Sequence, residues 1–161
     1  MLHVVKYIIV LFLLIVIQTQ IVRLVSLHGI TPDLLIIWIV YIGLKEGQIK
    51  ATLWGFGIGL ATDLVTGNFI GLTALTKTAS GFVAGYFYNE NKVQLTLSSY
   101  RFILIVLIVS LVHNTLYFII FTRGSEIGLF QAVFTVGLAA TLYTAMISLL
   151  PMVAFSRKYR R

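Results

Sequence analysis

The sequence contains no cysteine and few charged residues, and both shortages restrict what the protein can be. Without cysteine, the chain can form neither disulfides nor thiolate metal sites, and it cannot use cysteine catalysis. Only 11% of the residues are charged, whereas about a quarter are charged in a typical soluble domain. Hydrophobic residues make up 59% of the chain, and apolar runs of membrane-spanning length recur along it. We therefore expect a multispan membrane protein.

Several kinds of chemical site are also missing. The histidines His3, His28 and His113 lie far apart in the sequence, so they do not suggest a metal site. No segment fits the GxxxxGK[ST] pattern of a phosphate-binding loop. The acidic residues other than Asp63 fall at expected helix ends or turns, so no pair of deep carboxylates suggests acid–base catalysis. We expect a non-enzyme with no cofactor and no bound metal.

The apolar runs predict an all-α integral membrane protein, in which one domain over residues 1–161 forms a six-transmembrane-helix bundle. The predicted helices cover residues 4–26, 32–46, 48–66, 71–88, 99–122 and 128–154. The first apolar run has no small-residue cleavage site, so we expect a retained helix and not a signal peptide. Three residues mark the start of the second helix. Thr31 is its expected N-cap, Pro32 its first helical residue, and Asp33 lies near the positive end of its dipole.

The basic residues indicate how the bundle is oriented. If the N-terminus is cytoplasmic, nine basic residues lie on the cytoplasmic side, two lie outside, and Lys77 lies within a span. The nine are Lys6, Lys45, Lys50, Lys92, Arg101, Arg157, Lys158, Arg160 and Arg161, and the two are Arg23 and Arg123. This asymmetry predicts that both termini are cytoplasmic. The net charge of +7 therefore indicates topology and not nucleic-acid binding, although the basic tail can also contact anionic membrane lipid.

The polar residues of the spans gather in the outer half of the predicted bundle. Asp63 lies about one turn below the outer end of its helix, Lys77 roughly 9 Å below, and His113 and Asn114 about 12–13 Å below. Gln18 lies near the outer end of the first helix. An ionised side chain at depth is costly unless it is paired, so we expect Asp63 to pair with Lys77. His113 and Asn114 would then satisfy the remaining hydrogen bonds.

This polar cluster can be interpreted in two ways. It fixes the register of the helices, or it forms a substrate or proton site. The first interpretation is favoured, because charges that share one depth do not form a relay across the membrane.

Glycine is concentrated in the middle of the chain, with nine of the thirteen glycines between residues 43 and 85. Small residues at spacings of three and four allow two helix backbones to approach closely. The glycines expected to pack the third helix against the fourth are Gly55, Gly59, Gly81 and Gly85. Between these helices, Gly67 and Gly71 permit a reversal that is too tight for most side chains.

The run from Pro32 to Phe87 resembles the central region of the rod shape-determining protein MreD family. The shared pattern is GFxxGxxxDLxxGxxxGLxAL, which begins at Gly55 and includes Asp63. The Ile17–Gln18 pair, late in the first helix, also resembles that family. Lys77 departs from the pattern, because an uncharged residue is expected there.

The resemblance implies a membrane component of the bacterial cell-elongation machinery in the cytoplasmic (inner) membrane. Such a protein would bind MreC and, through it, act with the actin-like MreB, the glycosyltransferase RodA and the elongation penicillin-binding protein in peptidoglycan synthesis. The family's fold is similar to the substrate-binding subunits of energy-coupling-factor vitamin transporters, which supplies an alternative function. The first helix contains neither alanine nor glycine for docking a transporter partner, which argues against that alternative. A polar pocket that faces outward argues mildly for it.

We expect the protein to hold a segment of MreC without catalytic turnover. The polar groups near the outer leaflet suggest that this contact lies at the outer rim of the bundle. The residues expected to form the rim are Gln18, Asp63, Thr66, Asn68 and His113.

Overall fold

The structure is a computed structural model, which describes residues 2–22, 26, 30–67, 69–122, 130 and 132–159. The regular elements in these ranges are helices. In chain order they are α1 (Leu2–Val16), the π-helix η1 (Ile17–Ile21), α3 (Leu34–Glu46), α4 (Gln48–Thr66), α5 (Leu72–Tyr86), the 3-10 helix η2 (Glu90–Lys92), α6 (Val93–Leu97), α7 (Tyr100–Phe121), the π-helix η4 (Ala132–Gly137), α9 (Leu138–Ile147) and α10 (Leu149–Tyr159). The bounds of α4 are those of the third predicted helix.

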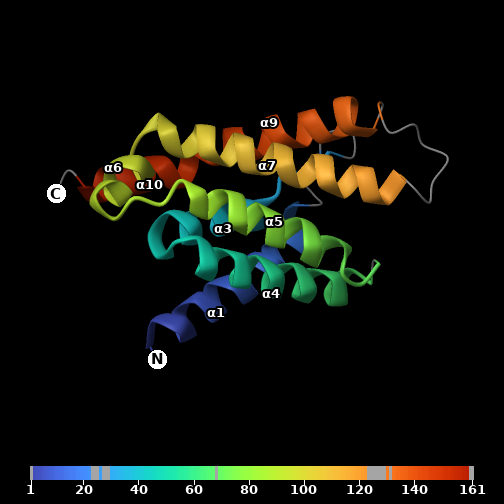
Figure 1. The fold of residues 1–161 in the computed structure, drawn as a ribbon, viewed down its shortest axis with the longest axis horizontal. Coiled ribbons are helices and arrows are strands. Elements are labelled where there is room, and N and C mark those ends of the chain that lie inside the picture. Colours follow the sequence, from blue (N-terminus) through green and yellow to red (C-terminus); the bar gives the residue numbers. More distant parts are fainter. Residues whose placement is uncertain are drawn as a thin grey trace.

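The long helices lie roughly alongside one another (Figure 1). In the middle of the bundle α5 contacts α3, α4 and α7, and α9 packs against α7. α1 begins and α10 ends at one end of the bundle, where α6 also lies, and the turn between α4 and α5 lies at the opposite end (Figure 1). These ends are termed the terminal end and the turn end.

Large apolar side chains lie both inside the bundle and on its surface. The buried core between α3, α5 and α7 includes Ile36, Val40, Phe102 and Val106. Leu53 and Phe82 are more than half exposed, as are many other large apolar side chains, and such a surface suits lipid better than water. Tyr100–Phe121 and Ala132–Arg157 are long and apolar enough to cross a bilayer. The fold is therefore all-helical and has the character of a membrane protein.

The start of α3 differs from the prediction. The N-cap is Asp33 and not Thr31, and the helix begins at Leu34. The Asp33 Oδ1 atom accepts the backbone N–H groups of Leu35 at 2.9 Å and Ile36 at 3.1 Å. Because aspartate is a better N-cap than threonine, the helix starts two residues later than expected.

Three segments are divided more finely than predicted. The expected first helix, over residues 4–26, contains α1 and the π-helix η1 in its described part. The expected turn after α5 contains η2 and α6, because Val93 and Leu97, one helical turn apart, pack onto the apolar core. The expected last helix is divided into η4, α9 and α10. α9 ends at Ile147, and Pro151 has no N–H group to donate to the Ile147 carbonyl, so the regular helix is interrupted there.

Candidate functional site: a buried polar cluster

Asp63 is fully buried near the end of α4, and it caps the helix that follows. Its Oδ2 atom accepts the N–H groups of Gly71 at 2.9 Å and Ala74 at 3.1 Å, and its Oδ1 atom accepts that of Thr73 at 3.2 Å. The first N–H groups of a helix have no acceptor within that helix. Gly71, at the N-cap position of α5, has no side chain to supply one. Asp63 therefore provides the missing cap and ties the end of α4 to the start of α5.

Two glycines shape the turn between these helices. Gly67 follows α4 with φ of +68°, and Gly71 precedes α5 with φ of +100°. Both angles lie in the left-handed region, which is costly for residues with a side chain. The N–H group of Gly67 donates to the Asp63 carbonyl at 3.0 Å. The spacing of Asp63, Gly67 and Gly71 thus corresponds to one structural unit, in which a helix ends, the chain reverses and the next helix is capped.

Lys77 is almost completely buried on α5, at 1% exposure, and its ammonium group pairs with the carboxylate of Asp33. The bond is to Oδ2 of Asp33, whereas Oδ1 caps α3. One carboxylate therefore neutralises a buried cation and satisfies the N-terminus of its own helix. An unpaired charge at this position would be strongly destabilising.

The expected pair of Asp63 and Lys77 is wrong. The oxygens of Asp63 accept three backbone N–H groups, and Lys77 pairs with Asp33 across the contact between α3 and α5. The sequence placed Asp33 at a helix start and gave no sign that it would pair with Lys77. That pairing depends on how α3 packs against α5, which cannot be deduced from residue spacing.

His113, on α7, lies beside the Asp33–Lys77 pair. Its Nε2 atom is 3.7 Å from Oδ2 of Asp33, too far for a good hydrogen bond. Its Nδ1 atom is buried and has no hydrogen-bond partner in the part of the chain that the structure describes. His113 is therefore a buried neighbour of the Asp33 carboxylate without a good hydrogen bond to it.

Two further side chains hold the backbone on either side of Asp33. The Gln18 amide, on η1, donates to the Pro32 carbonyl at 2.8 Å and accepts the Leu34 N–H group at 2.9 Å. The N–H group of Asp33 donates to Oγ1 of Thr144, on α9, at 3.0 Å. Gln18 was a predicted member of the cluster, whereas Asp33 and Thr144 were not. Two signals in the sequence could have identified them. Asp33 lies at a helix start, and Thr144 belongs to a series of small residues at helical spacing, namely Gly137, Thr141, Thr144 and Ser148.

The cluster of Asp33, Lys77, His113, Gln18 and Thr144 joins η1, α3, α5, α7 and α9. Three cavities in the described part of the chain have none of Asp33, Lys77 and His113 in their walls. This arrangement suits a cluster that fixes the helices relative to one another better than one that binds a substrate.

Asn114 belongs to a different contact. Its amide nitrogen donates to Oγ1 of Thr141 at 2.9 Å, to the Gly137 carbonyl at 3.3 Å and to Oγ of Ser110 at 3.4 Å. Asn114 therefore joins α7 to η4 and α9. The expectation that it would satisfy hydrogen bonds around Lys77 is corrected.

The predicted packing glycines lie between α4 and α5, at positions where their backbones meet the opposite helix. The facing residues are Gly55 and Lys77, Gly59 and Ala74, Gly81 and Ala51, and Gly85 and Gln48. A Cβ atom at any of these glycines would overlap the facing backbone. Gly43, which the prediction did not include, faces Ala84 in the same way between α3 and α5, where an added Cβ would lie 2.9 Å from the Ala84 Cβ.

The rim expected to meet a partner consists of Gln18, Asp63, Thr66, Asn68 and His113, and the structure exposes it only in part. Asp63 and His113 are buried, at 0% and 6% exposure, so they support the surface without forming it. Gln18 and Thr66 are partly exposed, and Asn68 lies outside the described residues. Among the described residues of this turn, the large side chains of Phe69 and Ile70 are exposed, at 77% and 72%.

Comparison with protein-family models matches residues 1–160 to the rod shape-determining protein MreD family. The match extends the resemblance noted between Pro32 and Phe87 to essentially the whole sequence. Comparison with curated proteins and with solved structures gave no match. The likeness to the substrate-binding subunits of vitamin transporters therefore stays a prediction. The family match and the all-helical membrane fold agree, and the chain belongs to the MreD family.

Proposed function

We propose that this protein is a non-catalytic scaffold or regulator in the machinery that synthesises peptidoglycan during bacterial cell elongation. The match to the MreD family over residues 1–160 carries the proposal, because that family acts in rod shape determination. The internal contacts of Asp33, Asp63 and Lys77 support a binding role over catalytic turnover. These groups hold helices together and are not directed into any of the three cavities.

The proposed arrangement is a single domain with six spans in the bacterial cytoplasmic membrane and with both termini in the cytoplasm. Two features support it. α1 begins and α10 ends at the same end of the bundle (Figure 1). The exposed basic residues Lys50, Arg101 and Arg157 belong to helix ends on that side. The terminal end would then be cytoplasmic, and the turn end would face outward.

The proposed direct partner is MreC, through which the protein would act with MreB, RodA and the elongation penicillin-binding protein. The contact zone is the turn end, around Thr66 and Asn68. Phe69 and Ile70 there border a hollow of about 420 Å³ between α5 and α7. A segment of MreC leaving the membrane at this level would find apolar side chains to pack against and polar groups beside them.

Copurification with MreC tests this function. Ile70→Glu should lower the amount of MreC retained by the purified protein at least ~tenfold, since an anchoring apolar residue contributes about 2 kcal/mol or more. Ile49→Glu is the matched control, because Ile49 is 78% exposed and lies at the terminal end. It should retain MreC at the level of the unmodified chain.

Two results would contradict the proposal. One is equal retention of MreC by the two variants, with folded yields that are also equal. The other is copurification of a vitamin and ATPase subunits in place of MreC, which would favour the transporter alternative.

A further inference from the structure

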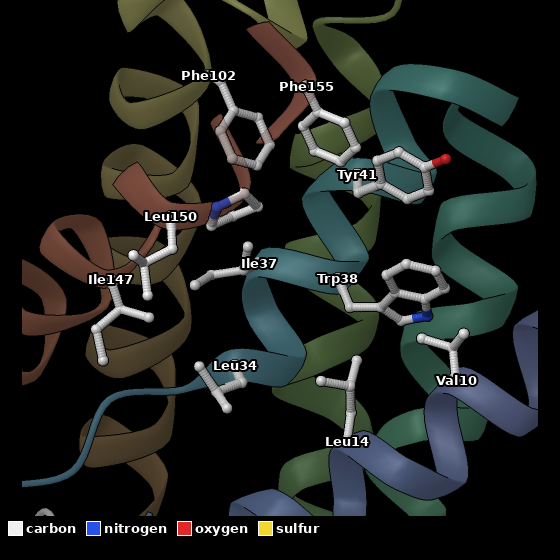
Figure 2. A pocket seen from close by; sticks show the side chains of 11 residues that line it. Val10, Leu14, Leu34, Ile37, Trp38, Tyr41, Phe102, Ile147, Leu150 and Phe155 are labelled. Carbon is white, nitrogen blue, oxygen red and sulfur yellow. The ribbon is translucent and has the colours of Figure 1, made fainter. Parts of the chain in front are cut away.

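An apolar groove, unrelated to the polar cluster, runs along the side of the bundle between α1, α3 and α10 (Figure 2). Its volume is about 350 Å³, near the lower end for ligand pockets. The side chains that define its length are Val10, Leu14, Trp38, Tyr41, Leu150 and Phe155. We name it the α1–α10 groove.

The groove exists because two elements pack incompletely. α1 keeps Phe12 and Leu13 exposed at 68% and 54%. Pro151, which lies in the groove wall, interrupts the last helix so that α10 does not continue α9 as one regular helix. No side chain of the described residues fills the space left between α1 and α10.

The groove has an aromatic end and an aliphatic end. Figure 2 shows Tyr41, Phe155 and Phe102 together at one end, with Leu14 and Leu34 at the other. The rings of Tyr41 and Phe155 are stacked, with centroids 5.4 Å apart and planes 7° apart. Aromatic residues of this kind are typical of the level at which a membrane meets water.

A basic residue borders the aromatic end. The Lys45 ammonium donates to the Tyr41 hydroxyl at 3.3 Å and lies 5.5 Å from the centre of the Tyr41 ring. The Lys45 side chain is exposed and forms no ion pair with a carboxylate among the described residues, since the nearby Glu46 pairs with Lys50 at 2.7 Å. This end of the groove therefore carries a positive charge without an ion-pair partner in the described part of the chain.

We propose that the α1–α10 groove binds one anionic phospholipid. An acyl chain lies along the aliphatic wall, and the phosphate lies beside Lys45. Charge complementarity selects this occupant, because an apolar transmembrane helix of another protein would fill the groove but would leave the Lys45 ammonium without an anionic partner. Anionic lipids are enriched in the cytoplasmic leaflet, which is the side proposed for the terminal end. The site does not depend on MreC being the partner.

Native mass spectrometry of the full chain in detergent tests this site, with dioleoyl phosphatidylglycerol and dioleoyl phosphatidylcholine added in parallel. The unmodified chain should retain one phosphatidylglycerol in preference to phosphatidylcholine. Leu150→Trp fills the groove from a position 73% exposed, and it should abolish that retention. Met146→Trp is the control, because Met146 is 67% exposed but does not line the groove.

A second pair of variants tests the headgroup contact. Lys45→Gln should weaken phosphatidylglycerol binding about fivefold, since each basic residue near a membrane surface makes a contribution of that size. Lys50→Gln removes a charge at the same end, but from a lysine that pairs with Glu46, and it should change binding less.

Three outcomes would overturn the proposal. The first is equal retention of the two lipids, which would mean that lipid only surrounds the protein. The second is equal loss of retention in Leu150→Trp and Met146→Trp. The third is loss of MreC copurification in Leu150→Trp with lipid retention unchanged, which would make the groove a docking site for a helix.

Discussion

Asp33 and Asp63 perform related tasks with different partners. Each carboxylate satisfies N–H groups in the first turn of a helix, Asp33 for its own α3 and Asp63 for the neighbouring α5. Asp63 needs no cation, because three N–H groups surround it. Asp33 has one oxygen free for Lys77. The sequence showed that Lys77 needs an acid, but two acids lie near its depth and spacing does not choose between them.

The pairing of Lys77 can be tested by thermal unfolding in detergent. Lys77→Met leaves Asp33 as an unpaired carboxylate, and the free energy of unfolding should fall by on the order of 3 kcal/mol. This lies at the low end of the range for a broken buried pair, because the Asp33 side chain is 22% exposed. Adding Asp33→Asn to Lys77→Met should restore most of the stability, since asparagine can still cap α3.

Adding Asp63→Asn to Lys77→Met is the control, and it should restore nothing, because among the described residues Lys77 pairs with Asp33 and the Asp63 carboxylate accepts backbone N–H groups. Rescue by the Asp63 change instead of the Asp33 change would show that this pairing is wrong.

At the scale of helices, the contact between α4 and α5 was the one that the sequence predicted most directly. Small residues repeated at spacings of three and four identify a helix face directly, and the structure places Gly55, Gly59, Gly81 and Gly85 on facing backbones. The division of the last helix was harder to predict. Pro151 is visible in the sequence, but a proline in a membrane helix can either bend it or interrupt it, and neighbouring helices decide which.

Two alanine substitutions separate packing from helix propensity. Gly81→Ala would place a Cβ 2.7 Å from the Ala51 carbonyl carbon, so α4 and α5 must move apart, and the folded yield in detergent should fall. Gly57→Ala lies in the same helix pair, but its Cβ would have no atom within 4 Å. It should leave stability unchanged or raise it by about 0.5–1 kcal/mol, because alanine favours the helix. Equal losses in the two variants would contradict the packing account.

At the scale of the whole molecule, the two ends of the bundle differ in chemistry. The terminal end combines basic residues with the aromatic end of the α1–α10 groove, whereas the turn end presents Phe69 and Ile70 beside a buried aspartate cap. Apolar length predicted the bounds of α7 to within one residue at each end, because the thickness of a bilayer limits such a helix, whereas it did not predict the division of the last helix. The choice of ion pair, the groove and the burial of two expected rim residues, Asp63 and His113, depend on contacts between segments distant in sequence.

The central claim is that MreC contacts the turn end directly, and site-specific photocross-linking in cells tests it most directly. A photoreactive phenylalanine analogue at Phe69 should cross-link to MreC. The same analogue at Leu95, which is 52% exposed at the terminal end, should not. Cross-links to MreC from Leu95 but not from Phe69, or from neither position in cells that make both proteins, would contradict the account.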